Sequence, residues 1–140
     1  DEALNKNSHN YTIEDIEISQ KETFYNMIKL LVSKESMYNL TTVATLSKAL
    51  SKLIGYDEKK SDNIYYASML RNIGEILSIE KDKKTDYQYL LSGYLLVNNS
   101  IDTDFIEVTK QIMTQYKEHF DGTGFPKQRK ENEIYISAYI

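Results

Sequence analysis

Two histidines and no cysteine limit the chemistry available to this chain of 140 residues. The histidines are His9 and His119. Because imidazole and thiolate hold most transition metals in proteins, a metal centre rich in either ligand cannot be assembled here. Thiol catalysis and disulfide bonds are also excluded. The lack of cysteine is compatible with a reducing cytoplasm, where we expect the protein to reside.

A glycine-rich segment with two carboxylates is the second chemically informative feature. Glu118 precedes the run Asp121-Gly122-Thr123-Gly124-Phe125-Pro126. Two glycines allow backbone angles that other residues avoid, and the single proline of the chain constrains the exit. We predict a tight turn that leaves a helix. The predicted interaction surface consists of Glu118, Asp121, Gly122, Thr123, Gly124, Phe125 and Pro126.

Helical spacing of hydrophobic residues predicts the elements that position this turn. The predicted apolar faces are Phe24, Met27, Ile28, Leu31 and Val32; Val43, Leu46, Leu50, Leu53 and Ile54; Ile64, Ala67, Leu70, Ile73 and Leu77; Tyr87, Leu90, Leu91, Tyr94 and Leu95; and Phe105, Val108, Ile112, Tyr116 and Phe120. The sequence therefore predicts an all-α bundle of about five helices around one core.

The predicted folded domain runs from residue 19 to residue 140. Ser19 and Glu22 match a capping box, in which two side chains satisfy free backbone N–H groups at a helix start. Residues 1–18 are polar and weakly patterned, so we interpret them as a linker or the cut edge of a longer chain.

Charge and hydropathy exclude two classes of partner. The formal net charge is −4 and the sequence pI is about 5.2, which disfavours nucleic-acid binding. No apolar run approaches the ~20 residues that a membrane span needs. The arginines are Arg71 and Arg129, although planar recognition of phosphate favours arginine. We expect no nucleic-acid and no membrane partner.

Four motifs in order, from Asn39 onward, resemble the HD-GYP domain, a bacterial phosphohydrolase that cleaves cyclic di-GMP at a metal centre of His and Asp. The run Leu70-Arg71-Asn72-Ile73-Gly74-Glu75-Ile76 has the frame of the family motif Leu-His-Asp-Ile-Gly-Lys-Ile. The run from Tyr116 to Pro126 has the frame of His-His-Glu-x-x-Asp-Gly-x-Gly-Tyr-Pro. Asn39 and Tyr89 stand where the family has two further histidines.

The resemblance implies that the family's metal-ligand positions have changed residue type. These vacated positions are Asn39, Arg71, Asn72, Tyr89, Tyr116 and Lys117. An amide is a weak neutral ligand, Arg and Lys repel a cation, and Tyr ligates only when deprotonated. The resemblance therefore implies a degenerate domain with no metal and no cofactor. We predict that it is not an enzyme but a pseudo-enzyme without phosphodiesterase activity.

Glu75 stands where the family has a Lys that faces the phosphate. A carboxylate there would repel a dianionic ligand, so binding of cyclic di-GMP at this site is possible but not favoured. Arg71 and Glu75 leave two interpretations open. They could form an exposed ion pair of small worth, or Arg71 could point into the vacated pocket and pair with Glu118, Asp121 or Glu75.

The resemblance implies a regulatory or protein-interaction module of bacterial cyclic di-GMP signalling. Family analogy suggests self-association, GGDEF-type cyclases or receiver domains as partners. Three alternatives stay open: a sensor that binds a cyclic dinucleotide without hydrolysing it, an active metal-dependent phosphodiesterase with an atypical site, and a domain merely preserved by its neighbours. The resemblance also predicts a helix start in residues 134–140, where alternation alone would allow a strand, and a truncated C-terminal part of the family fold.

Overall fold

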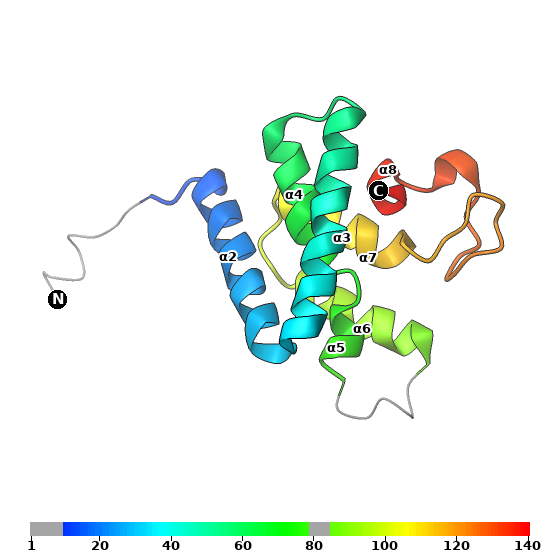
Figure 1. The fold of residues 1–140 in the computed structure, drawn as a ribbon, viewed down its shortest axis with the longest axis horizontal. Helices are drawn as coiled ribbons and strands as arrows, with labels where there is room; N and C mark the ends of the chain where they lie inside the picture. Colours follow the sequence, from blue (N-terminus) through cyan, green and yellow to red (C-terminus); the bar gives the residue numbers. More distant parts are fainter. Residues whose placement is uncertain (1–9, 79–84) are drawn as a thin grey trace, which may run out of the picture.

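The computed structural model describes residues 10–78 and 85–140 and folds them into helices joined by turns (Figure 1). The elements are α2 (Ile13–Leu31), α3 (Lys34–Leu53), α4 (Glu58–Met69), α5 (Ile73–Ile76), α6 (Asp86–Asn98), α7 (Asp104–Gln115), the 3-10 turn η2 (Glu131–Glu133) and α8 (Ile136–Tyr139). The predicted all-α fold is confirmed, and so is the helix start in residues 134–140. Across the described residues, no helix has both the length and the apolar character needed to cross a membrane.

Helix α2 begins at Ile13, so the predicted helix start at Ser19 is wrong. The backbone N–H of Asp15 donates to the Thr12 hydroxyl at 3.1 Å, and the backbone N–H of Thr12 donates to the Asp15 carboxylate at 2.9 Å. This reciprocal capping box satisfies N–H groups that have no partner within the helix. The folded part of the chain therefore reaches further toward the N-terminus than predicted, and His9 lies outside the described residues.

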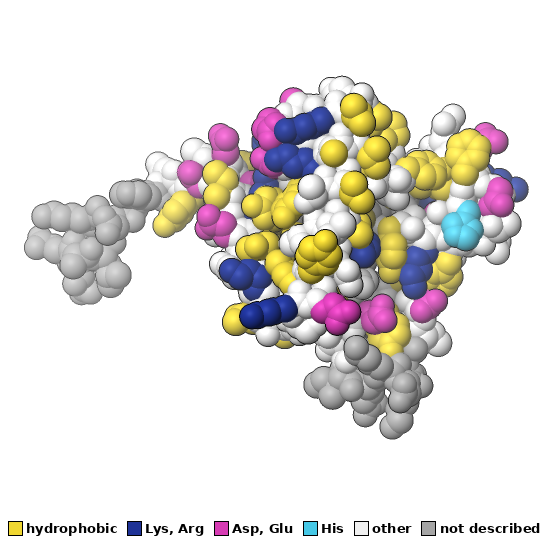
Figure 2. Space-filling view, in the orientation of Figure 1, with side chains coloured by type: hydrophobic (Ala, Val, Ile, Leu, Met, Phe, Trp, Pro, Cys, Tyr) yellow, Lys and Arg dark blue, Asp and Glu magenta, His cyan; other side chains and the backbone are white. Residues whose placement is uncertain are grey.

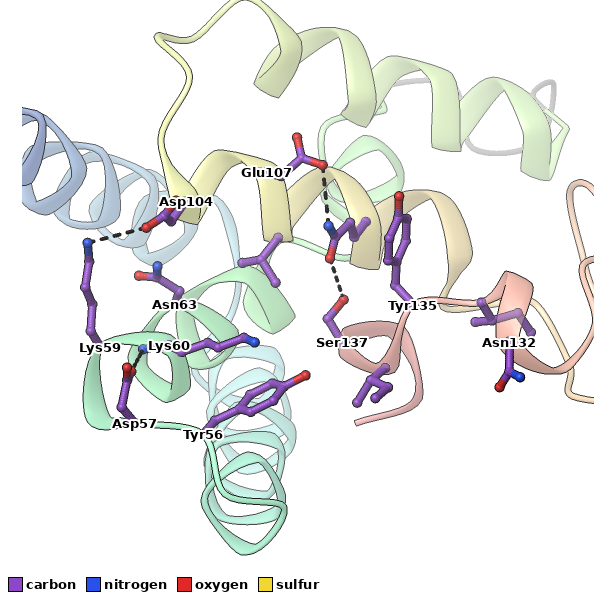
Figure 3. A pocket seen from close by; sticks show the side chains of 14 residues that line it. Tyr56, Asp57, Lys59, Lys60, Asn63, Asp104, Glu107, Asn132, Tyr135 and Ser137 are labelled. Atoms are coloured by element: carbon purple, nitrogen blue, oxygen red, sulfur yellow. Dashed lines mark hydrogen bonds and ion pairs between the residues drawn. The ribbon is translucent and has the colours of Figure 1, made fainter.

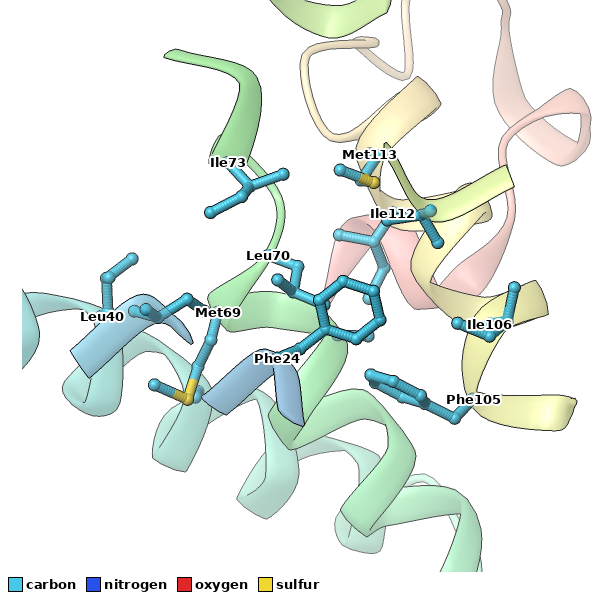
Figure 4. Packing of buried hydrophobic residues seen from close by; sticks show 13 residues of the cluster. Phe24, Leu40, Met69, Leu70, Ile73, Phe105, Ile106, Ile112 and Met113 are labelled. Carbon is cyan, nitrogen blue, oxygen red and sulfur yellow. The ribbon is translucent and has the colours of Figure 1, made fainter. Parts of the chain in front are cut away.

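The hydrophobic core lies where α2, α4 and α7 meet (Figure 4). Phe24 of α2 and Phe105 of α7 are both buried, with ring centroids 6.2 Å apart. Leu70 and Ile73 flank the turn between α4 and α5 and are fully buried. Burial of one side chain of this size stabilises the fold by roughly 1.5–3 kcal/mol, so these residues fix the turn that carries Arg71.

Helix α3 turns a different face to the core from the predicted one. Its predicted apolar face is 36–81% exposed, and Figure 2 shows hydrophobic side chains on the solvent side of this helix. The buried residues of α3 are instead Leu40, Ala44, Ser47 and Ser51, and α3 packs against α4. Small side chains let the two helix backbones approach closely, which leaves no room for the larger residues.

Helices α5 and α6 cross at two buried glycines. A Cβ atom added to Gly74 would collide with the backbone carbonyl oxygen of Tyr89. A Cβ atom added to Gly93 would lie 2.9 Å from Cε of Met113 and 3.1 Å from the backbone nitrogen of Gly74. Gly93 and Val97 form the buried face of α6. Tyr87, Leu91 and Leu95 are exposed, so the prediction that they form the buried face of this helix is wrong.

We predict that Gly74→Ala destabilises the protein, because the new methyl group meets backbone that cannot move aside without separating α5 from α6. The expected loss in the free energy of unfolding is about 3 kcal/mol, measured by urea denaturation. Asn98→Ala, at the exposed end of α6, is the control and should change it by less than about 0.5 kcal/mol. Equal stability of the two variants would contradict the close crossing.

Candidate functional site

Five of the six vacated motif positions line one small pocket. Arg71, Asn72, Tyr89, Tyr116 and Lys117 surround it, and they come from the turn before α5, from α6 and from the end of α7. The free volume is about 20 Å³, which is room for about one water-sized group. The sixth position, Asn39, is exposed on α3 and does not line this pocket, so the sequence located most of the site but not all of it.

Arg71 lies half-buried against the pocket and not in bulk solvent. One of its terminal nitrogens, Nη1, donates to the backbone carbonyl of Ser68 at 3.1 Å. Among the described carboxylates, including those of Glu75, Glu118 and Asp121, none lies within 4.0 Å of its guanidinium. Arg71 therefore lines the pocket, whereas neither of the two kinds of ion pair considered from the sequence is present among the described residues.

Burial and charge set the protonation of the pocket. Burial lowers the pKa of the Arg71 guanidinium, but arginine stays charged in proteins. Burial raises the pKa of the Tyr116 phenol, and the Lys117 ammonium opposes that rise. Lys117 itself lies 3.5 Å from a carboxylate oxygen of Asp86. Near neutral pH the pocket therefore contains a neutral phenol and two cations, together with the acidic side chains of Glu75 and Asp86.

These side chains do not fit a divalent metal ion. The Asn72 Oδ1 atom is buried without a hydrogen-bond partner, so one oxygen could serve as a ligand. The guanidinium, the ammonium and the protonated phenol beside it repel a cation or donate hydrogen bonds. The acidic residues of the lining are Glu75 and Asp86, and Asp86 lies 3.5 Å from the Lys117 ammonium. Nowhere in the described part of the chain do three or more His, Cys, Asp or Glu side chains cluster closely enough to hold a metal.

Glu118 anchors the segment 118–126, which we call the signature loop. Its carboxylate accepts hydrogen bonds from the backbone N–H groups of Lys127 at 2.7 Å and Arg129 at 3.0 Å. Glu118 is 6% exposed, and Gly124 is buried beside it. Both were predicted on the interaction surface, and that placement is wrong because they hold the loop from inside.

The outer part of the signature loop is exposed and internally hydrogen-bonded. Asp121 accepts from the backbone N–H of Thr123 at 2.9 Å and from its hydroxyl at 2.7 Å. These bonds, the hydroxyl first, hold the pKa of Asp121 below its usual value. Gly122 has a φ of +80°, a conformation that favours glycine. Phe125 and Pro126 are only half-exposed, because the Phe125 ring lies edge-on to Tyr87.

Phe120 is an exposed residue of the signature loop that sequence reasoning placed in the core. Helix α7 ends at Gln115, so Phe120 lies beyond its apolar face and is 63% exposed. Its ring centroid lies 6.2 Å from that of Tyr139 in α8. His119 is also exposed, and its Nδ1 atom lies 3.0 Å from the Thr123 hydroxyl. Gly122 and Gly124, which follow Phe120 in the sequence, could have indicated that the helix ends before this residue.

A larger pocket of about 690 Å³ lies between α4, α7 and α8 (Figure 3). Its charged residues are largely engaged within the chain. Lys59 lies 3.4 Å from Asp104, and the Lys60 ammonium lies 3.6 Å from the ring centroid of Tyr56. Gln111 joins Ser137 to Glu107 through two hydrogen bonds, as Figure 3 shows. Most charged groups of this pocket are therefore already paired, whereas the buried Oδ1 atom of Asn63 in its lining has no hydrogen-bond partner.

Comparison with known proteins decides the family. The HD domain family model matches residues 22–140. The chain belongs to the HD domain family. A curated relative is the 3'3'-cGAMP-specific phosphodiesterase 2 of Vibrio cholerae, with 27% identity over 139 residues. The match covers 90% of this chain and 26% of the relative, so the chain spans about a quarter of the length of that protein.

The comparison corrects one prediction from the sequence. We predicted that the chain is not an enzyme, but the curated relative of this HD domain is a phosphodiesterase, which points to an enzyme family. The prediction treated the loss of family ligands as the loss of the reaction. Residue types around one pocket describe which ligands it can hold, and they do not decide whether the whole protein catalyses a reaction.

We predict that Glu118→Gln loosens the signature loop, because a neutral amide oxygen replaces the carboxylate that two backbone N–H groups share. The expected loss in the free energy of unfolding is about 1–3 kcal/mol, with faster amide exchange at Lys127 and Arg129. Glu22→Gln, on the exposed face of α2, should leave both measurements unchanged. Unaltered exchange at these two amides in the Glu118 variant would contradict the anchoring role.

Proposed function

We propose that this HD domain is an HD-GYP-like regulatory module of cyclic-dinucleotide signalling that binds a protein partner through its signature loop. The observation that carries this proposal is the buried Glu118 carboxylate, which holds the loop in one shape from below. Two backbone hydrogen bonds also hold the loop in this shape. The N–H of Phe125 donates to the carbonyl of Lys117 at 2.9 Å, and the N–H of Glu131 donates to the carbonyl of Phe120 at 3.1 Å. A loop that is already ordered loses little conformational entropy when it binds.

The exposed tip of the loop has the composition of an interface anchor. Phe120 and Tyr139 form a tilted ring pair, and they are 63% and 45% exposed. Aromatic residues supply much of the binding energy at protein interfaces, especially where polar groups surround them. Asp121 and Thr123 provide such polar groups on the same loop. Asp121 and Thr123, the exposed members of the predicted interaction surface, therefore lie on the same loop as the exposed aromatic residue Phe120.

We infer the signalling class from the curated relative and from the resemblance of the four motifs to HD-GYP domains. The relative's name specifies 3'3'-cGAMP, and the four motifs of this chain resemble HD-GYP domains, which act on cyclic di-GMP. Family analogy favours a GGDEF-type cyclase as the partner, with a receiver domain or a second copy as alternatives. We also propose that the domain acts in the cytoplasm, where cyclic dinucleotides are made and degraded.

We predict that Phe120→Ala weakens binding of a purified GGDEF-type cyclase domain from the same genome at least tenfold, because it removes the aromatic centre and leaves the Glu118 anchor intact. Isothermal titration calorimetry measures the change. Tyr11→Ala, which removes an exposed ring near the opposite end of the chain, is the control and should bind as the wild type does. Binding that is equally strong in the Phe120 variant would overturn the proposed surface.

The same preparations separate regulation from catalysis. Each is incubated with 3'3'-cGAMP and cyclic di-GMP in the presence of Mn²⁺, and the products are resolved by chromatography. Hydrolysis by the wild type would assign the relative's reaction to this chain and would make partner binding a second role rather than the main one.

A further inference from the structure

Helix α2 is fastened to the start of α7 by polar side chains as well as by the ring contact of Phe24 with Phe105. Glu17 and Gln20 of α2 form hydrogen bonds with residues that lie 81–88 positions later in the chain, in the segment 101–105. We call these two side chains and their hydrogen-bond partners the polar latch. Helix α2 lies along one flank of the bundle (Figure 1), whereas α7 also packs against α4, α6 and α8. The latch therefore joins a peripheral helix to a central one.

The Glu17 carboxylate caps α7 from outside that helix. It is 2% exposed, and its Oε2 atom accepts a hydrogen bond from the backbone N–H of Phe105 at 3.1 Å. Phe105 lies in the first turn of α7, where the N–H groups have no acceptor within the helix and form the positive end of the helix dipole. The ammonium groups of Lys21 and Lys59 lie 3.5 Å and 3.9 Å from the Oε1 atom. One buried carboxylate thus connects α2, α4 and α7.

Gln20 forms the second half of the polar latch. Its Nε2 atom donates to the backbone carbonyl of Ile101 at 2.7 Å, and its Oε1 atom accepts from the Thr103 hydroxyl at 2.7 Å. The Thr103 hydroxyl in turn accepts from the backbone N–H of Ile106 at 3.2 Å, which caps α7. The first turn of α7 is therefore held by hydrogen bonds that begin on α2.

Burial makes the polar latch favour two positions of α2. Glu17 and Phe105 are almost inaccessible to water, so a small displacement of α2 would leave a carboxylate and an N–H group without partners. A buried polar group without a partner carries the full cost of its removal from water, and this cost is larger for a charged group. A larger displacement admits water, which satisfies both groups again. The closed and the released positions are thus both favoured over those between them.

The opposite end of α7 carries the candidate site. The helix spans Asp104 to Gln115, which is about 18 Å at 1.5 Å per residue, and Tyr116, Lys117 and Glu118 follow directly. The buried side chain of Gln115 also accepts a hydrogen bond from the backbone N–H of Tyr135 at 2.8 Å. A shift of α7 along its axis or around it would move the residues of the family pocket and the anchor of the signature loop together.

We propose that the polar latch is a regulatory device, which in its closed position holds α7 where the signature loop keeps its shape. Release of α2 then loosens the loop at the far end of α7. Its meaning as regulation rests on the proposed function, because the loop is the proposed binding surface. The structural effect needs no partner. A latch with a merely structural role would weaken the whole domain evenly, including α3, which packs mainly against α4.

The test is amide hydrogen exchange, measured by NMR on the whole chain. Gln20→Met keeps the length of the side chain and removes its hydrogen bonds, and Glu17→Gln removes the charge that caps α7. In both variants the signature-loop amides of Phe125, Lys127 and Arg129 should exchange at least fivefold faster relative to the amides of α3. The wild-type partners of these three N–H groups are the Lys117 carbonyl and the Glu118 carboxylate.

Two controls separate coupling from a general loss of stability. Glu22→Gln changes an exposed carboxylate of α2 outside the polar latch. Ile64→Val removes one buried methyl group from α4 and weakens the core. Each should change the ratio of loop exchange to α3 exchange by less than twofold. An unchanged ratio in Gln20→Met would overturn the proposal, and so would an equal rise in Ile64→Val. If Glu17→Gln does not fold, Gln20→Met decides alone.

A titration of the GGDEF-type cyclase domain into the same variants distinguishes the latch from the proposed function. Release of the latch should weaken binding at least threefold. Faster loop exchange with unchanged binding would support the latch and contradict the proposed binding surface. Unchanged loop exchange would overturn the latch whatever the binding.

Discussion

The arrangement of the site depends on the close contact between α5 and α6. Gly74 and Gly93 bring two backbones together where any side chain would push them apart. The turn that carries Arg71 and Asn72 precedes α5, and α6 carries Tyr89, so this contact sets the distance between them. It also closes the pocket to about 20 Å³. A pocket this small is filled by the chain's own side chains.

The sequence predicted the fold class because the helical periodicity is strong, and it located the pocket because the motif frame preserves Gly74 and Gly93. The sequence did not predict which face of α3 is buried, because that helix has two sets of residues with helical spacing. The larger residues form one stripe, and Leu40, Ala44, Ser47 and Ser51 form the other. Periodicity cannot decide which stripe is buried when small residues allow closer helix packing. The partner helix α4, also rich in small buried residues, decides it.

The sequence also did not indicate which side chains of the signature loop are buried and which are exposed. Glu118 and Asp121 are both acidic, yet one is buried under the loop and the other is exposed on it. The difference arises from the backbone N–H groups of residues 127 and 129, which lie where Glu118 can accept them both. Such a contact depends on how the chain returns after Pro126. The same return places Arg129 beside α6, which no spacing pattern along the sequence indicated.

We propose that the pocket of the HD motif positions, which Arg71, Tyr116 and Lys117 line together with Glu75 and Asp86, does not bind a divalent metal ion. Titration with Mn²⁺ followed by NMR line broadening tests it most directly. We expect no saturable broadening centred on Asn72, Tyr116 and Lys117, with any effect confined to scattered surface carboxylates. Saturable broadening that is centred on these three residues and disappears in Asn72→Ala would contradict it.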